Sequence, residues 1–339
     1  MSFTDELKSA VTPRAALLVI GVLALQLLFI ASYVGALHDP KPRDVPFGVV
    51  APGPAAEEAS ARLGKLPGDP LDPRVVESEA AARKKIMDRD IDGALVIDPR
   101  GTTDTLLVAS GGGTALATAL DRITTQVEAA EKRTVRTVDV APASGQDFNG
   151  LSSFYLVVGW CVGGYLCASI LAISAGSRAA NGPRALIRTG AMALYSVVGG
   201  LGGALIIGPV LGALPGSIMG LWGLGALIVF AVGMITLALQ SLTGIVGIGL
   251  AVLVVVIAGN PSAGGAFPLP MLPPFWEAIG PWLPPGAGTW VARSIAYFEG
   301  NAVTGPLLVL AAWAVVGTAV TLVMSALRGD RRPGETRAP

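Results

Sequence analysis

Residues 217–259 read SIMGLWGLGALIVFAVGMITLALQSLTGIVGIGLAVLVVVIAG and contain no Asp, Glu, Lys, Arg or His. A helix needs about 20 apolar residues to cross the hydrocarbon core of a bilayer. This stretch is long enough for two such helices, 217–239 and 242–259, which meet at Gln240 and Ser241. The pattern predicts an integral membrane protein.

Four further stretches have the same character, namely 15–37, 151–175, 189–214 and 304–327, which brings the prediction to six transmembrane helices. The first is longer than the apolar core of a signal peptide, which is about 7–15 residues, so we expect an uncleaved anchor. Only 14% of the 339 residues are charged, whereas soluble domains carry about 25%. The bilayer is therefore the expected surrounding of most of the chain.

Basic residues indicate how the chain is oriented, because short cytoplasmic segments are enriched in Lys and Arg. They occur in segment 1–14, in the connection after the second span and in the tail 328–339, whereas Arg293 is the only basic residue in the short connections 214–216 and 259–303 on the opposite side. We expect a multi-pass protein of the cell membrane with both termini in the cytoplasm and residues 38–150 outside. Lys plus Arg and Asp plus Glu balance at 24 each, so charge gives no reason to expect nucleic acid.

The segment 38–150 carries the signals of a small α/β domain. We expect strands at 45–50, 94–97, 105–109 and 135–140, and helices at 77–90 and 115–133. Residues 110–113, SGGG, lie between a strand and a helix but lack the Lys-Ser/Thr ending of a nucleotide-binding loop. We interpret them as a simple turn, with Thr114 capping the helix.

No catalytic, metal or cofactor site is predicted. The chain has two cysteines inside one apolar run and a single histidine, His38, which leaves no material for a catalytic triad or a metal cluster. The basic run 83–85 is balanced by nearby acidic residues and indicates a solvated helix face. Glycine pairs four apart, such as Gly159 and Gly163, suit either packing within the chain or a dimer face.

The connection 259–303 is rich in proline, glycine and aromatic residues. We expect short helices at 272–279 and 289–297. Two interpretations of its aromatic side chains stay open. They are an anchor at the level of the lipid headgroups or an external gate over a substrate path, with Phe275, Trp276, Trp282 and Trp290 as the candidate residues.

Several strings along the chain carry a resemblance to a known family: VPFGVV at 45–50, DIDGALVI at 90–97, GNPSAGG at 259–265 and LPPFW at 272–276. Their order, within a plan of one span, an α/β domain and five more spans (151–327), is similar to that of the ABC-2 type exporter permeases. It resembles more closely the YhgE/Pip-like and DUF3533 membrane proteins. GNPSAGG and LPPFW resemble the re-entrant stretch before the family's final span.

The resemblance implies a permease subunit that forms a homodimer and is powered by a separate ATP-binding subunit. It places candidate docking elements at 2–13 and 177–188, with Arg178, Arg184 and Arg188 as candidate coupling residues. The spans also lack the ionisable residues of proton-coupled transporters, which favours energy from a partner. The alternative is a non-transporting receptor or scaffold whose external domain binds a ligand or protein. The substrate is left open.

Overall fold

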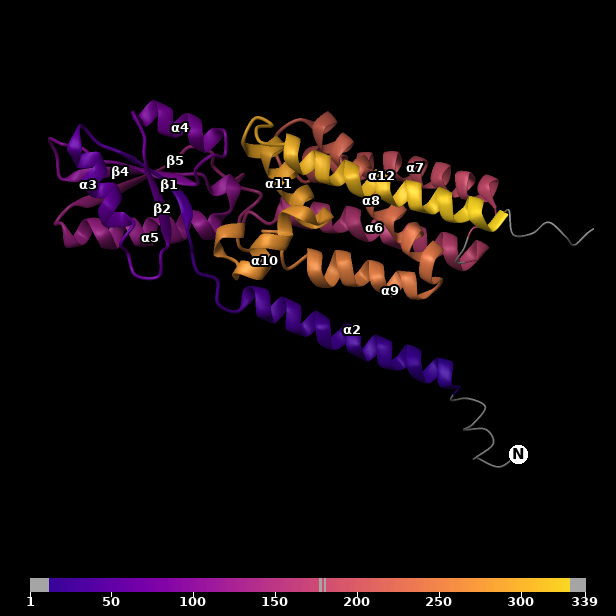
Figure 1. Cartoon of the computed structure of the whole chain (residues 1–339). Coiled ribbons are helices and arrows are strands. Elements are labelled where there is room, and N and C mark those ends of the chain that lie inside the picture. The colour runs from indigo at the N-terminus through magenta and orange to yellow at the C-terminus, as the bar shows by residue number, and fades with distance from the viewer. Residues whose placement is uncertain (1–11, 177–178, 180, 330–339) are drawn as a thin grey trace, which may run out of the picture.

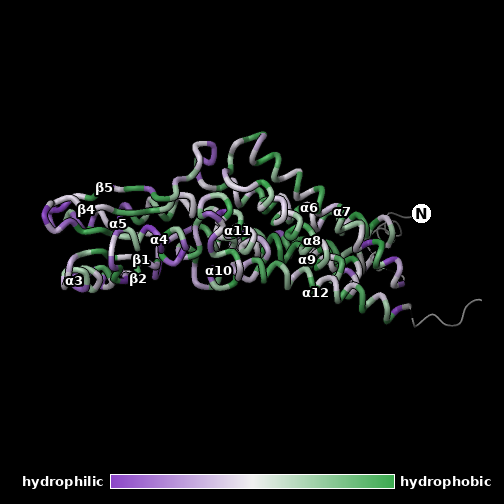
Figure 2. Tube along the Cα trace, turned by 90° about the horizontal axis from the view of Figure 1, so that it is seen from above, coloured by the Kyte–Doolittle hydropathy of each residue, from purple (hydrophilic) through white to green (hydrophobic). Residues whose placement is uncertain are grey.

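The computed structural model describes residues 12–176, 179 and 181–329 of the chain. It contains an α/β domain at one end and a bundle of long helices at the other, and helix α2 (Pro13–Leu37) lies beside the bundle (Figure 1). Figure 2 shows that apolar residues dominate the bundle, whereas polar residues are concentrated in the α/β domain. The division matches a protein with one part in lipid and one part in water.

The α/β domain is built on a five-stranded sheet of order β2-β1-β3-β4-β5. The strands are β1 (Val45–Val50), β2 (Leu71–Val75), β3 (Gly93–Val96), β4 (Thr103–Val108) and β5 (Thr134–Asp139). Only the pair β3 and β4 is antiparallel, and its register places Gly93 opposite Val108. The other three pairs are parallel.

Helices cover both faces of the sheet. Helices α3 (Pro54–Leu63) and α5 (Thr114–Ala130) pack on one face, where Phe47 and Leu120 are fully buried. Helix α4 (Glu79–Met87) packs on the other face, where Ile86 contacts the sheet. Side chains of a strand alternate between faces, so Phe47 and Val50 of β1 belong to different cores.

The predicted strands and helices of this domain are confirmed to within a few residues, but β2 and α3 were missed. Strand β2 reads LDPRV, and its Pro73 cannot donate to a sheet hydrogen bond. Proline is tolerated here because β2 lies at the edge of the sheet. Helix α3 starts at Pro54, directly after Gly53. Proline and glycine together are typical of a turn, so no local pattern in the sequence indicated that a helix begins here.

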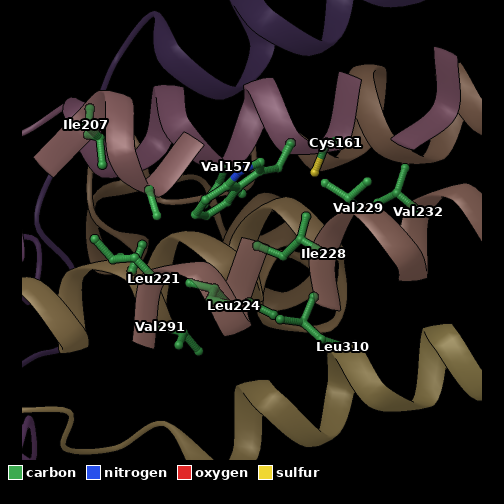
Figure 3. Packing of buried hydrophobic residues seen from close by; sticks show 14 of the residues in the cluster. Val157, Cys161, Ile207, Leu221, Leu224, Ile228, Val229, Val232, Val291 and Leu310 are labelled. Atoms are coloured by element: carbon green, nitrogen blue, oxygen red, sulfur yellow. The ribbon is translucent and has the colours of Figure 1, made fainter. Parts of the chain in front are cut away.

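The bundle is organised around α8 (Ile218–Thr243), which packs against α6 (Ser152–Ala175), α7 (Gly182–Leu205) and α12 (Thr304–Gly329). Figure 3 shows the buried apolar side chains between these helices, among them Val157, Ile228 and Leu310. Gly200 of α7 lies against the α8 backbone, where an added Cβ would come 2.5 Å from the Ala226 nitrogen. Small residues therefore set the approach of these two helices.

Five of the six predicted spans are helices long and apolar enough to cross a membrane. The remaining one, 242–259, forms a shorter helix made of α9 (Val246–Val252) and the π-helical η3 (Leu253–Gly259). At 1.5 Å per residue it extends about 21 Å, less than the roughly 30 Å of a hydrocarbon core. Gly244, at φ +70°, ends α8 and shortens the next helix.

Helix α2 stands apart from the bundle. Of the 18 residues that form the most apolar part of α2, only 6% are buried in the structure, whereas the corresponding share in α8 is 50%. It packs against η3, and Leu25 lies beside Gly249 of α9, where an added Cβ would come within 3.6 Å of the Leu25 Cδ1. Most of the apolar surface of α2 is thus left for lipid or another protein to cover.

The segment 260–303 contains α10 (Pro274–Ile279) and α11 (Pro284–Tyr297), close to the two predicted short helices. Helix α11 begins five residues earlier than predicted, because Pro284 and Pro285 occupy first-turn positions where proline is favourable. It is packed against α6, α8 and α12. The segment therefore joins the bundle to the α/β domain.

Candidate functional site

The α/β domain contacts the 260–303 segment through the glycine-rich loop 110–113. Gly111 lies against Tyr297, where an added Cβ would approach the ring Cγ to 2.5 Å. Gly113, at φ +148°, lies against Pro268, where an added Cβ would come within 2.3 Å of Cγ. The loop is glycine-rich because two backbone segments meet there.

This finding refines the predicted simple turn and corrects its cap. Residues Ser110–Gly112 form a 3-10 turn, and Gly113 occupies the N-cap position of α5 without a side-chain hydrogen bond. The Thr114 hydroxyl donates instead to the carbonyl of Asn149, at 3.0 Å. Thr114 thus ties the start of α5 to the connection that leads into α6, and does not cap its own helix.

Arg89 reaches from the end of α4 into the 260–303 segment. It has a positive φ of 63°, and its Nη1 donates to the Trp290 carbonyl at 3.0 Å and to the Ser294 hydroxyl at 2.8 Å. Its guanidinium lies 3.4 Å from the centre of the Trp290 ring, a cation–π contact. Burial, followed by repulsion from Arg293, lowers the pKa of Arg89 to about 9.

Arg293 of α11 is 4% exposed and donates to three backbone carbonyls. Nη1 bonds Gly264 at 2.6 Å, and Nη2 bonds Gly265 at 2.7 Å and Gly150 at 3.1 Å. Its Nε has no hydrogen-bond partner in the described part of the chain. Burial lowers the pKa of Arg293 to about 10.

A second polar contact closes the junction beside Arg293. The Tyr297 hydroxyl donates to Asp147 Oδ2 at 2.8 Å, and it accepts a weak bond from the Ser144 amide at 3.4 Å. Burial and the nearby Asp147 carboxylate raise the pKa of Tyr297. The junction is thus held by side chains from the turn after α4, from α11 and from the connection before α6.

A cavity of about 280 Å³ lies between the α/β domain and the 260–303 segment. Its walls carry Arg89 and Arg293 together with the carboxylates of Asp44, Asp90, Asp92 and Glu277. Burial raises the pKa of Asp92 to about 6 and also raises the pKa of Glu277. Trp290, Thr289 and Pro268 contribute to the remaining wall. A cavity with both charge signs can bind a polar ligand.

The four candidate aromatic residues do not form one cluster. Trp290 lines the cavity and stacks on Arg89. Phe275 and Trp276 contact each other on α10, and Phe275 is exposed. Trp282 is also exposed and lines an apolar groove beside α12. Exposed positions such as those of Phe275 and Trp282 suit an anchor at the lipid headgroups. Of the four residues, Trp290 is the one on the cavity wall, which is the position expected of a gate residue.

The candidate coupling arginines occupy different environments. Arg178 lies outside the described residues, as does most of 2–13. Helix α7 starts at Gly182, earlier than the predicted 189, because Asn181 caps it and Pro183 follows. Arg188 is buried and donates to the carbonyls of Ala175 and Gly176, at 2.6 and 2.8 Å. It therefore caps the end of α6, and Arg184 is exposed at the surface.

Sequence reasoning did not single out Arg89, Asp92 or Arg293 as site residues. Arg89 follows the basic run 83–85, and the whole stretch was interpreted as a solvated helix face. One signal for Arg293 was present, because it is the only basic residue in a long connection on the side where the orientation rule disfavours arginine. A lone arginine in such a place indicates a specific role.

Comparisons of the chain with models of protein families, with curated proteins and with solved structures find no match.

Proposed function

We propose that this chain is the permease subunit of an ABC-2 type exporter, which works as a homodimer and is powered by a separate ATP-binding subunit. In this proposal both termini are cytoplasmic and the α/β domain is outside the cell. The short helix α9–η3 completes six passes by crossing at a locally thinner site, beside α2 and the 260–303 segment.

The observation that carries the proposal is the position of α11. This helix is buried along most of its length, from Pro284 to Ser294, and packs on α6, α8 and α12. Through Arg293 and Tyr297 it is also bonded to residues 144–150 and to the cavity wall. A movement of the bundle helices would therefore be transmitted directly to the α/β domain, as an external gate requires.

The exposed surface of α2 supports a dimer. A helix whose apolar side chains stay exposed in the single chain suits a second copy as its neighbour, and α2 has such side chains on all sides, including Leu17, Val22 and Ile30. No recognised ATP-binding loop is present in the sequence, so export would need an ATPase from elsewhere.

The receptor alternative is supported by a different observation, since the polar cavity lies at the domain junction and not inside the bundle. Affinity purification of the full chain in a mild detergent separates the two functions. The exporter proposal predicts that an ATP-binding subunit co-purifies in a fixed ratio. Repeated recovery of the chain without such a subunit, from membranes that contain one, would favour the receptor.

A further inference from the structure

The charges around the junction cavity are arranged in two groups. Arg89 lies near Arg293 and interacts with Asp92, and Arg293 interacts with Asp147, which is not on the cavity wall. Glu277 interacts with Asp44 and with Arg43, whose guanidinium donates to the Leu272 carbonyl at 2.9 Å. Counting only residues on the cavity wall at neutral pH, Arg89, Arg293 and Asp92 carry a net charge of +1, whereas Asp44 and Glu277 carry −2. Asp90 is also on the wall, but it is exposed and interacts with Lys84.

The two arginines of the first group retain donors that the protein does not use. In the described part of the chain Arg89 bonds through Nη1 alone, and the buried Nε of Arg293 has no partner. No carboxylate of the described residues lies within 4.0 Å of either guanidinium. Arg293 is 4% exposed, and a buried cation without a close counterion is costly, so a bound anion would offset that cost.

We propose that the junction cavity binds a small zwitterionic group, with its carboxylate or phosphate toward Arg89 and Arg293 and its ammonium toward Asp44 and Glu277. A purely anionic ligand would leave the two carboxylates unpaired, and a purely cationic one would face the arginines. Arginine presents a planar fork that suits a carboxylate or phosphate.

The size of the cavity limits the ligand to a head group. About 280 Å³ is below the roughly 300–1,000 Å³ of sites that enclose drug-sized molecules. The group belongs either to a free zwitterion or to the head of a lipid whose chains stay in the bilayer. This inference goes beyond the proposed export function, because it holds for an exporter and for a receptor alike.

Calorimetric titration of the purified full chain in a mild nonionic detergent at pH 7.5 tests the proposal. The probes are glycerophosphoethanolamine and glycylglycine, each compared with singly charged counterparts, glycerophosphoglycerol and ethanolamine. We expect at least one zwitterion to bind about tenfold more tightly than either singly charged probe. Absence of binding by both zwitterions, or equal binding of zwitterions and singly charged probes, would overturn the proposal.

Dihexanoyl phosphatidylethanolamine distinguishes the two sources of the ligand. Binding comparable to that of glycerophosphoethanolamine supports a lipid head group, and binding of the free zwitterion alone supports a soluble ligand. Both results require the same cavity, so both support the proposal.

Two substitutions test which end of the cavity binds the ammonium and which end binds the phosphate. In Glu277→Gln the preference for glycerophosphoethanolamine over glycerophosphoglycerol should be lost, while the thermal unfolding temperature changes little. Arg89→Gln should weaken both phosphate probes about tenfold or more. The matched controls are Glu299→Gln and Arg100→Gln, which are exposed and do not line the cavity. Retention of the ammonium preference in Glu277→Gln would contradict the assigned orientation.

Discussion

Arg293 connects α11 to two other backbone segments, one at residue 150 and one at residues 264–265. Its guanidinium satisfies the carbonyls of Gly150, Gly264 and Gly265, and hydrogen bonds to charged groups contribute about 1.5–3 kcal/mol each. The residue therefore stabilises the junction through bonds that a different side chain cannot reproduce.

We predict that Arg293→Met lowers the thermal unfolding temperature of the detergent-purified chain, because three buried carbonyls lose their donor. Arg293→Lys should restore only part of the loss, since an ammonium lacks the planar fork. Differential scanning fluorimetry measures the effect, with the exposed Arg100→Met as the control. An unfolding temperature equal to that of the control would show that these bonds do not stabilise the junction.

Asp92 makes stability depend on pH. Its pKa is raised from 3.8 to about 6 by burial, so between these values the folded state holds a proton that the unfolded state has released. Stability from this group is therefore present at low pH and is lost as pH rises toward 6. We predict that Asp92→Asn flattens the fall in unfolding temperature between pH 4.5 and 7. An unchanged slope would argue against burial as the cause.

At the scale of elements, the loop 110–113 determines how closely the α/β domain approaches α11. Gly111→Ala would place a Cβ 2.5 Å from Tyr297 Cγ and 2.9 Å from the Ala141 carbonyl oxygen. We expect the domain to be displaced from the 260–303 segment.

Cross-linking of introduced cysteines at Asp88 and Asn301 by a short bismaleimide measures this displacement. The two residues are in contact, with Asn301 Nδ2 3.4 Å from Asp88 Oδ1. Gly111→Ala should reduce the cross-linked yield, whereas Gly145→Ala, where an added Cβ meets nothing within 4 Å, should not. Equal yields in the two variants would refute the role given to the loop.

Elements with strong local patterns could be predicted from sequence, and contacts between distant elements could not. Strand β1 was predicted at its observed bounds because Val45–Val50 is an apolar run closed by proline. Strand β2 was missed because its pairing with β1 outweighs the unfavourable Pro73. The cavity had no local signature, since Arg89 meets Ser294 across about two hundred residues.

At the scale of the whole molecule, the arginine asymmetry predicts the side of the membrane on which each part lies. Cysteines introduced at Ala61 of α3 and at Glu299 should react with an impermeant thiol reagent on intact cells. A cysteine at Ala175, at the end of α6, should react only after the membrane is opened. The parent chain, with Cys161 buried in α6, serves as the blank. Labelling at Ala175 on intact cells would reverse the proposed orientation.

The two arginines at the start of α7 separate structural and coupling roles. Arg188 caps α6, so its replacement should destabilise the bundle. Arg184 is exposed, and in the exporter proposal it contacts the ATPase. We predict that Arg184→Lys leaves folding intact but weakens association with that subunit by about 1–3 kcal/mol, the range for charge-assisted hydrogen bonds. Unchanged co-purification would leave Arg184 with a topological role alone.

The central claim is that an ATPase drives this chain, and ATP hydrolysis in reconstituted membranes tests it most directly. The co-purified ATP-binding subunit should hydrolyse ATP faster in the presence of the chain, and a cross-link between residues 88 and 301 should reduce the stimulated rate by holding the junction closed. A rate that is the same with the chain, without it and with the cross-linked chain would contradict the account.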